Sequence, residues 1–433
     1  MFRMKKLKVV FDVHLITDCL NPQNQGTGIF YVAYNVFKSL LKDERIELIL
    51  YDDRLTKERI DCFKKHFPCN NFKTLHSPKL SQALSLLKKY KSCNYKKYGS
   101  NILAKGTRGV IKIILLPIIK ILQAIYKRIR INLMSIYFSP VYKIPNWIER
   151  KQQKNKYVIL YDTVPLVLPD KNPTSNPDSW FMQLIRQINK KDNYFAISDF
   201  TKREFIKHVP LINDKRITVA LLAASDKFYP SADKDINKTI REKYNIPLDK
   251  KYFLSLCTIE PRKNLTFSVK NFIEFIEQNS ISDLVFVLAG GYWKNYSESI
   301  LHQIEEMDKY KNRIILTGYV DENDLAPLYS NAECFVYPSI YEGFGLPPLE
   351  AMQCGTPVIT SNVTSLPEVV GDVGIMINPY CDSELLDAYK RIYYDDNLRK
   401  ELSEKGIERA KQFSWKKCTD IMVNQFYKDL NVK

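Results

Sequence analysis

The sequence predicts an α/β protein built from two doubly wound domains, each with a parallel sheet. Its 433 residues, 45% of them hydrophobic, suit two domains of roughly 200 residues each. In both halves, apolar β-rich runs alternate with helical patterns, which favours sheets covered on both faces. The polar residues 225–250 predict a linker. We therefore expect a first domain over 1–224 and a second domain over 251–412.

The first domain opens as strand, glycine loop, helix and strand. Residues 7–13 and 46–51 are apolar and rich in β-formers, and the residues between Ile29 and Leu41 repeat at helical spacing. The helix follows a loop that contains Gly26, Thr27 and Gly28. Because the loop does not match Gly-x-Gly-x-x-Gly, it does not indicate a dinucleotide site. Read alone, it is either part of a binding site or a plain entry to the helix.

Residues 77–136 interrupt this alternation with a basic and apolar segment. The longest apolar run, 113–119, has seven residues, whereas a bilayer span needs about 20. On a helix, six basic residues would lie within about 60° of one direction; they are Lys105, Arg108, Lys112, Lys120, Lys127 and Arg130. This composition favours a helix lying in a membrane interface. The alternative is a helix packed on the core with a solvated basic face.

Regular alternation resumes at residue 157, where an apolar strand ends in Asp162. A second strand at 192–198 precedes a helix that Asp199 is expected to cap, and a third strand is expected at 217–221. Farther on we expect strands at 252–258, 283–289, 313–316, 333–337 and 357–361, with helices at 264–279, 297–308, 322–331 and 348–354. Ligands of such parallel sheets bind beyond the carboxyl ends of the strands. Every motif of interest in this half falls at such an end.

The most informative stretch is a glycine turn between the strand at 333–337 and the helix at 348–354. It runs from Glu342 through Gly343, Phe344, Gly345 and Leu346 to Glu350, with two prolines near the helix start, where no N–H donor is needed. The N-terminus of the helix points backbone N–H groups and a positive dipole at one place, where an anion can bind. Carboxylates on either side can accept hydrogen bonds from hydroxyls. The stretch therefore suits a sugar nucleotide, although Gly-x-Gly alone is a weak signal.

A basic pair follows the strand at 252–258. Arg262 and Lys263 lie between that strand and a helix that Asn264 is expected to cap. A guanidinium fork and an ammonium point charge at the carboxyl end of a strand can bind a diphosphate. Taken alone, an Arg-Lys pair in a basic protein is usually solvent-exposed charge.

Two of these motifs together resemble a known family. Residues 260–264 read Glu-Pro-Arg-Lys-Asn, and residues 342–359 read Glu-Gly-Phe-Gly-Leu-Pro-Pro-Leu-Glu-Ala-Met-Gln-Cys-Gly-Thr-Pro-Val-Ile. Both are similar to the signatures of glycosyltransferase family 4 ("glycosyl transferases group 1"), the large retaining family with the GT-B fold. That family includes bacterial polysaccharide mannosyltransferases and sucrose and glycogen synthases. The resemblance implies two Rossmann-like domains that face a cleft, with a C-terminal helix over 413–433 crossing back to the first domain.

The resemblance also implies roles for the donor-site residues. Arg262 and Lys263 would neutralise the diphosphate, helped by backbone N–H groups of the turn Gly343, Phe344, Gly345 and Leu346. Glu350 would hold the ribose hydroxyls, and the base would lie near Val320. Glu342 would contact the sugar and place its anomeric carbon. The acceptor would attack on the face from which the leaving group departs, without a protein nucleophile.

The first domain would bind the acceptor. The resemblance implies that the loop of Gly26, Thr27 and Gly28 and the loop after Asp162 face the cleft between the domains. Many family members carry histidine where this chain has Tyr161, so a candidate general base is missing and the role of Asp162 stays open. We expect a lipid-linked or oligosaccharide acceptor in surface polysaccharide (lipopolysaccharide) synthesis.

Charge and cysteine content set further expectations. The net charge of +17 implies acidic partners such as nucleic acid, anionic lipid or phosphorylated substrates. The nine cysteines form no Cys-x-x-Cys and indicate reduced thiols in a cytoplasmic protein. No Asp-x-Asp follows a strand, so we expect no metal and no cofactor beyond a GDP- or UDP-linked sugar. We expect the protein to sit peripherally on the inner face of the cytoplasmic membrane.

Two other classes of function are weighed against this one. The first is another enzyme on the same fold, a sugar-nucleotide epimerase or a phosphorylase, although five histidines are few for an epimerase. The second is a basic module that binds nucleic acid, which 27 tyrosines permit but do not indicate. We expect a glycosyltransferase that does not bind nucleic acid.

Overall fold

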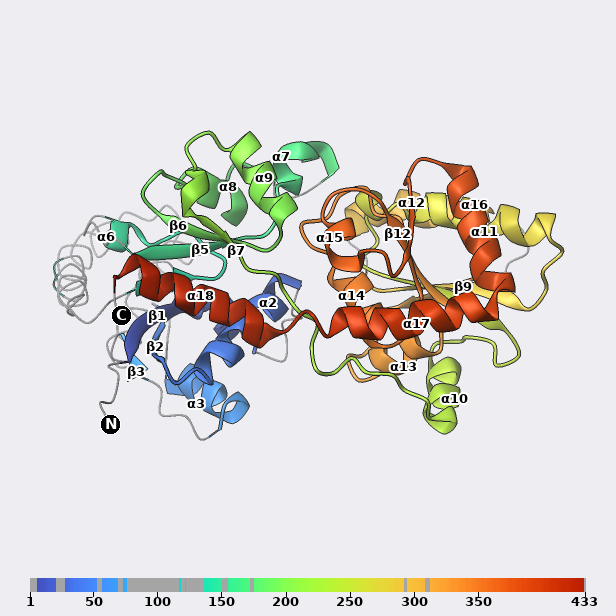
Figure 1. Ribbon diagram of the computed structural model, residues 1–433, viewed down its shortest axis with the longest axis horizontal. Coiled ribbons are helices and arrows are strands. Elements are labelled where there is room, and N and C mark those ends of the chain that lie inside the picture. The colour runs from blue at the N-terminus through green and yellow to red at the C-terminus, as the bar shows by residue number, and fades with distance from the viewer. Residues whose placement is uncertain are drawn as a thin grey trace, which may run out of the picture. The chain divides into compact units, whose positions relative to one another are not determined.

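A computed structural model describes residues 6–20, 28–52, 57–68, 73–75, 117, 121, 136–149, 155–171, 175–291, 294–307 and 312–431 (Figure 1). The chain forms two compact units. The first unit consists of Met1–Ile159, Gln187–Phe195 and Thr419–Lys433, and the second of Leu160–Arg186 and Ala196–Cys418. The expected domain limit at residue 224 and the linker over 225–250 stay predictions.

The first sheet has seven strands in the order β3-β2-β1-β4-β5-β6-β7. Its centre is apolar on both faces, since Val9, Val10 and Phe11 of β1 are fully buried. Every described pairing of β1 is parallel, with β2 on one side and β4 on the other. The strands are β1 (Leu7–Asp12), β2 (Ile46–Tyr51), β3 (Lys73–Thr74), β4 (Ile136–Ser139), β5 (Lys156–Leu160), β6 (Asn193–Ala196) and β7 (Ile217–Val219).

Helices of the first unit pack apolar faces on this sheet. The expected helix after the glycine loop is α2 (Gly28–Leu41), whose buried residues Val32, Val36 and Leu40 lie on one face. The other helices are α1 (His14–Cys19), α3 (Lys57–His66), α6 (Asn146–Glu149) and α18 (Trp415–Asp429). Phe426 of α18 packs edge-on against Tyr157, at 4.7 Å between ring centroids.

The second sheet has six strands in the order β10-β9-β8-β11-β12-β13. They are β8 (Lys251–Leu256), β9 (Leu284–Ala289), β10 (Ile314–Gly318), β11 (Cys334–Tyr337), β12 (Val358–Ser361) and β13 (Ile375–Ile377), all joined in parallel. β9 is apolar and buried along its whole length. The first five strands confirm the expected strands of this half to within two residues.

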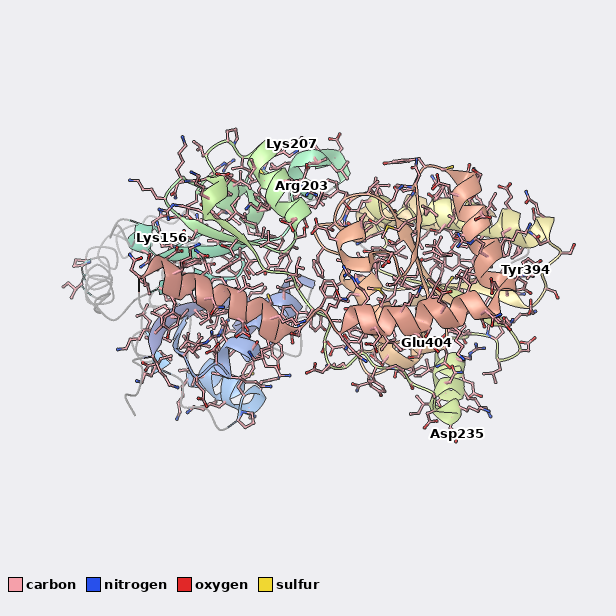
Figure 2. All side chains as sticks on the ribbon, viewed as in Figure 1. Lys156, Arg203, Lys207, Asp235, Tyr394 and Glu404 are labelled. Carbon is pink, nitrogen blue, oxygen red and sulfur yellow. The ribbon has the colours of Figure 1, made fainter. Side chains whose placement is uncertain are left out.

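Among the helices of the second unit, two layers cover the second sheet (Figure 1). In one layer α11 contacts α12 and α16, and in the other α14 contacts α13, α15 and α17. The helices are α7 (Val164–Val167), α8 (Trp180–Ile185), α9 (Asp199–His208), α10 (Lys234–Lys243), α11 (Leu265–Gln278), α12 (Lys294–Met307), α13 (Leu325–Ser330), α14 (Leu346–Gln353), α15 (Leu366–Val370), α16 (Asp382–Tyr394) and α17 (Asp396–Ala410). Short 3-10 turns occur at η2 (Pro169–Lys171), η4 (Asp214–Arg216) and η5 (Pro261–Lys263). Charged side chains such as Lys207, Asp235 and Glu404 are exposed on these helices (Figure 2).

Two helix caps differ from the sequence prediction. Ser198, not Asp199, caps α9, because its hydroxyl accepts a hydrogen bond from the N–H of Thr201. Asn264 stands at the N-cap position of α11 but makes no side-chain cap. Its backbone is left-handed, with φ of 58°, and its amide donates to the carbonyl of Pro379 at 2.8 Å. The asparagine therefore turns the chain and leaves the helix N-terminus uncapped.

Candidate functional site

The central strands of the second sheet lie where the strand order reverses. β8 pairs directly with β11, while the chain continues from β8 to β9 on one side and from β11 to β12 on the other. The loops that leave two such strands diverge, and ligands of open α/β sheets bind beyond them. These loops are residues 257–264 and 338–345, which carry both of the motifs found in the sequence.

The loop after β8 carries a buried charge cluster. Glu260 and Lys263 are each 6% exposed. Nη2 of Arg262 lies 2.6 Å from Oε1 of Glu260, and its Nη1 donates to the carbonyl of Tyr341 at 2.9 Å. The carbonyl of Arg262 in turn accepts from the N–H of Ile340 at 2.9 Å. The two loops are therefore held to each other by backbone and side-chain bonds.

One carboxylate oxygen of Glu342 collects four donors. Its Oε1 lies 2.8 Å from Nη1 of Arg262, 2.6 Å from Nζ of Lys263, 2.8 Å from the hydroxyl of Tyr337 and 2.7 Å from that of Ser339. A carboxylate offers about four lone-pair sites over two oxygens, so four donors exceed what one oxygen can fully satisfy. We name these four donors and the Glu342 carboxylate the carboxylate cradle.

The charges of the cradle reinforce one another. Burial raises the pKa of Glu342, but Arg262, Lys263 and Ser339 outweigh burial and lower this pKa to about 2. Glu342 is therefore ionised at neutral pH. Burial lowers the pKa of Arg262, yet Glu342 and Glu260 outweigh it and raise that pKa above its usual value. Two cations and two carboxylates thus balance within the protein.

The cradle nevertheless has donors to spare. Nε of Arg262 is buried and has no hydrogen-bond partner. Lys263 has three N–H donors and directs two of them at Tyr337 and Glu342. A buried N–H without a partner costs about 1–3 kcal/mol. Such a group at a strand end suits a ligand oxygen that would accept from it.

The glycine turn next to the cradle depends on two glycines. Gly345, the N-cap of α14, has a φ of +124°, a conformation that other residues rarely adopt. A Cβ at Gly343 would lie 2.2 Å from the carbonyl oxygen of Tyr161. Pro347 occupies the first turn of α14 as expected. Pro347 and Pro348 have no N–H, and the N–H of Leu349 donates to the carbonyl of Gly345. The N–H of Leu346 is therefore the donor at the start of α14 that has no partner within the helix and can bind an anion.

Phe344, between these glycines, faces the protein interior. Its side chain is buried, and its ring lies edge-on to that of Phe413 with 6.0 Å between centroids. Only the backbone of Phe344 is therefore suited to a ligand. Leu346 begins α14, and Val320 is a buried residue just beyond β10.

Glu350 lies in the second turn of α14, and no cation of the described residues pairs with it. The hydroxyl of Tyr329 donates to its Oε2 at 3.2 Å. Burial raises the pKa of Glu350 to about 7, and the Tyr329 hydrogen bond opposes this only in part. Glu350 therefore differs from Glu342 in electrostatic environment, although both are carboxylates of one motif.

Asp162 lies beside the glycine turn, within the second unit. An added Cβ on Gly343 would come within 2.8 Å of the Cβ of Asp162. Oδ1 of Asp162 accepts from the N–H of Val164 at 3.0 Å. Burial raises the pKa of Asp162, and the positive charge of Arg262 opposes this shift.

Two hydroxyls hold the turn from the same side. Ser198 and Thr201 donate to the carbonyl of Gly343 at 2.6 and 2.9 Å, and Thr201 is also 3.0 Å from the carbonyl of Tyr161. These bonds fix the position of the turn relative to Asp162.

Some predicted features lie outside the described residues. Gly26 and Thr27 are among them, whereas Gly28 is the first residue of α2. All six residues of the basic stripe at 105–130 also lie outside. Within the part of the chain that the structure describes, no helix has the length and apolar character needed to cross a bilayer. The same residues contain no group of three or more His, Cys, Asp and Glu side chains placed to hold a metal ion.

Sequence reasoning missed the polar neighbours of Glu342. Tyr337 was expected only as the last residue of a strand, and no prediction was made for Ser339. Glu260 belongs to a quoted motif but received no role. The available signal was a tyrosine at the end of a buried strand and a serine two residues later, both shortly before Glu342.

The sequence matches the family described as glycosyl transferases group 1 over residues 236–409. Among characterised proteins, it is 32% identical to the O-antigen chain mannosyltransferase B of Escherichia coli over 292 residues, which cover 67% of this chain and 74% of that protein. It is 28% identical to the serotype-specific mannosyltransferase WbdA of Escherichia coli over 269 residues, 62% of this chain. The match spans only 33% of the length of WbdA.

Solved structures share the fold along nearly the whole chain. A glycosyltransferase from Rickettsia africae superposes with a TM-score of 0.65 over 99% of this chain and 100% of that one, at 14% identity. The sucrose-phosphate synthase of Thermosynechococcus elongatus gives a TM-score of 0.62 over 98% and 99% of the two chains, at 20% identity. Two parallel sheets with helices on both faces and these likenesses confirm the expected GT-B fold.

Proposed function

This chain belongs to the glycosyl transferases group 1 family, and from this premise we propose that it transfers mannose from a nucleotide sugar to a glycan of a bacterial surface polysaccharide. Glycosyl transfer follows from the family. Mannose and the polysaccharide acceptor are inferred from three relatives that are named as mannosyltransferases, two of them for the O-antigen chain. Retention of anomeric configuration is part of the proposal.

The observation that carries this proposal is the carboxylate cradle at the strand-order reversal. Arg262 and Lys263 bring two positive charges to the carboxyl end of β8, beside the N-terminus of α14. The spare N–H of Arg262 and the third N–H of Lys263 can bind phosphate oxygens. We therefore assign the diphosphate of the donor to this place, with the N–H groups near Gly345 and Leu346 as further donors.

Glu350 is proposed to bind the ribose and Val320 to border the base. The carboxylate of Glu350 has one protein donor, Tyr329, which leaves lone pairs for two hydroxyls. Glu342 is proposed to accept from hydroxyls of the sugar through the oxygen that the cradle does not use. These placements put the anomeric carbon between Glu342 and the diphosphate.

The chemical step follows from this arrangement. The bond from the anomeric carbon to the phosphate oxygen breaks, and its electron pair leaves with the diphosphate. The acceptor oxygen forms the new bond on the same face, and its proton passes to the departing phosphate. Arg262 and Lys263 stabilise the growing negative charge more in the transition state than in the ground state, which lowers the barrier without requiring a metal ion.

The acceptor side is proposed to include Asp162 and the loop of Gly26, Thr27 and Gly28. Asp162 lies beside Gly343, so it is within reach of a group bound at the turn. The raised pKa of Asp162 suits a residue that exchanges a hydrogen bond with a hydroxyl. We propose that the acceptor is lipid-linked and that the basic stripe at 105–130 binds the anionic surface of the membrane.

Donor binding and the product test the proposal. A thermal-shift screen with UDP, GDP, UDP-glucose and GDP-mannose should show stabilisation by one nucleotide and its sugar. NMR of the transfer product should then show the same anomeric configuration as in the donor. Filter binding to RNA serves as the comparison. Binding of RNA without any nucleotide sugar would contradict the assignment, and an inverted product would contradict retention.

A further inference from the structure

The cradle places an internal anion where the donor's phosphate is proposed to bind. The Glu342 carboxylate is 2.6 Å from Lys263 and 2.8 Å from Arg262, and all three side chains are largely buried. A diphosphate that binds these cations must share them with Glu342. Because the pKa of Glu342 is about 2, its carboxylate carries this charge at every physiological pH.

We propose that Glu342 competes with the diphosphate for Arg262 and Lys263, and that this competition expels the nucleoside diphosphate product after transfer. This inference rests on the proposed function. It assigns Glu342 a second task, to distinguish the donor from the spent nucleotide.

The groups that the Glu342 carboxylate can bind differ between the two complexes. With a nucleotide sugar, hydroxyls of the sugar offer hydrogen bonds to Glu342, so the carboxylate stays satisfied while the phosphates bind the cations. With a nucleoside diphosphate alone, no sugar hydroxyl is present. A buried carboxylate deprived of its cations is strongly disfavoured. Glu342 therefore regains Arg262 and Lys263, and the phosphate leaves.

Tyr337 and Ser339 support this return. Both hydroxyls donate to the same Oε1 that faces the cations, at 2.8 and 2.7 Å, and both residues are buried. They are neutral, so they hold the carboxylate in the cradle without adding charge that would attract phosphate. Tyr337 and Ser339 are thus positioning residues for Glu342.

Glu260 provides a matched comparison within the same site. Its Oε1 lies 2.6 Å from Nη2 of Arg262, so it also lowers the positive charge of the site. Unlike the carboxylate of Glu342, that of Glu260 makes no contact with the ammonium of Lys263 or with the two hydroxyls among the described residues; only its backbone carbonyl accepts from the N–H of Lys263. Removal of either carboxylate should strengthen phosphate binding through charge, but only Glu342 should respond to the sugar.

The test measures calorimetric affinities for GDP, UDP, GDP-mannose and UDP-glucose in the wild type, Glu342→Gln and Glu260→Gln. Glu342→Gln should bind the free nucleoside diphosphate about tenfold more tightly and the nucleotide sugar more weakly, because one nearby negative charge and one sugar contact are lost. Its product inhibition constant should fall by a similar factor. Glu260→Gln should tighten both ligands by the same factor.

Three results would overturn the inference. The first is that Glu342→Gln binds the nucleoside diphosphate no more tightly than the wild type. The second is that its affinities for the nucleoside diphosphate and the nucleotide sugar shift by the same factor. The third is that Glu260→Gln changes the ratio of these two affinities. If Glu342→Gln does not fold, Glu342→Asp decides, since it keeps the charge but withdraws it by one methylene. In Glu342→Asp, the affinity for the nucleoside diphosphate relative to that for the nucleotide sugar should exceed the wild-type ratio, but by less than the factor expected of Glu342→Gln. An unchanged ratio overturns the inference. A wild type that binds no nucleotide would instead refute the proposed function, and the inference with it.

Discussion

Each unit carries a buried charge cluster at the carboxyl ends of its strands, and the two clusters are satisfied differently. In the first unit, His14 bridges two carboxylates, with Nδ1 2.6 Å from Asp12 and Nε2 3.1 Å from Asp52. Tyr137 donates to Asp12 and Thr17 to Asp52, at 2.9 and 2.6 Å. Each of the four carboxylate oxygens has a partner there.

In the cradle of the second unit, the hydrogen-bond donors outnumber the acceptor positions that they contact. Four donors converge on one oxygen of Glu342, and Nε of Arg262 has no partner. A cluster whose oxygens are all paired holds elements together, whereas one with surplus donors can bind an anion. Burial and charge are common to both clusters and do not distinguish them. The second cluster differs from the first in having an unpaired donor beside two cations at the ends of strands.

The largest effect should come from breaking the first cluster. His14→Ala leaves two buried carboxylates without their shared partner, which should destabilise the protein by about 3–5 kcal/mol. Urea unfolding followed by circular dichroism measures this loss. His302→Ala is the control, because its contact with Glu306 is exposed on both sides and should be worth at most about 1 kcal/mol. Equal losses in the two variants would show that the first cluster is not structural.

Arg262→Ala should break the second cluster as a binding site. Loss of the guanidinium should weaken nucleotide-sugar binding by about 1.5–3 kcal/mol, the usual size for a hydrogen bond to a charged group. Calorimetry measures the affinity. Lys270→Ala removes an exposed cation of α11 that pairs with Asp382 of α16. This change should leave the affinity unchanged. Similar affinities in both variants would remove Arg262 from the donor site.

Glu350 sharpens the comparison, since it is a half-buried carboxyl that pairs with no cation of the described residues. Its pKa of about 7 exceeds the ordinary value of 4.5, so the folded protein holds this proton where the unfolded chain has lost it. Glu350 therefore contributes less stability as pH rises from about 4.5 through about 7. Ribose hydroxyls bind the ionised form better, so nucleotide-sugar affinity should rise about tenfold between pH 6 and 8. Glu350→Gln should abolish this dependence.

The measurement for Glu350 uses a nucleotide sugar, whose diphosphate carries no terminal phosphate to titrate in this range. Calorimetry in two buffers of different ionisation enthalpy should detect a proton released on binding near pH 6.5. The same proton release in Glu350→Gln would assign the effect to another group.

The smallest effect concerns the hydroxyls that hold Gly343. Thr201→Val removes bonds to the carbonyls of Gly343 and Tyr161 and should cost about 1 kcal/mol of stability. The midpoint of thermal unfolding reports the loss. Thr239→Val is the control. The hydroxyl of Thr239 donates to the exposed carbonyl of Asp235 within α10, so removal of this hydroxyl should have little effect on stability. A loss confined to Thr239→Val would contradict the role of Thr201.

The sequence was sufficient to predict the fold because its signals are local. Periodic apolar residues and prolines define elements such as α11, expected over 264–279 and observed over Leu265–Gln278. The positions of Arg262, Lys263 and Glu342 also followed, since motifs at strand ends of one parallel sheet meet at one edge. The family resemblance supplied the chemical roles.

The remaining features depend on tertiary contacts that no local pattern contains. The convergence of Tyr337 and Ser339 on Glu342 requires the exact path of the loop after β11. The cap of α9 was assigned to Asp199 because aspartate is a frequent cap, but the neighbouring Ser198 has the extended backbone that capping requires. Asn264 was misread for a similar reason, because its left-handed backbone turns its side chain to Pro379.

The packing of α18 has a consequence for how the protein is made. The ring of Phe426 completes an aromatic group with Phe138, Tyr157 and Phe195 in the first unit, at 4.7–5.8 Å between centroids. In the order of synthesis, however, Phe426 follows the whole second unit. Most of the second unit, which lies between Phe195 and Phe426, is therefore synthesised before the first unit can complete this aromatic group. Nascent chains would spend that interval with a half-built first unit, the period in which chaperones act on exposed apolar surface.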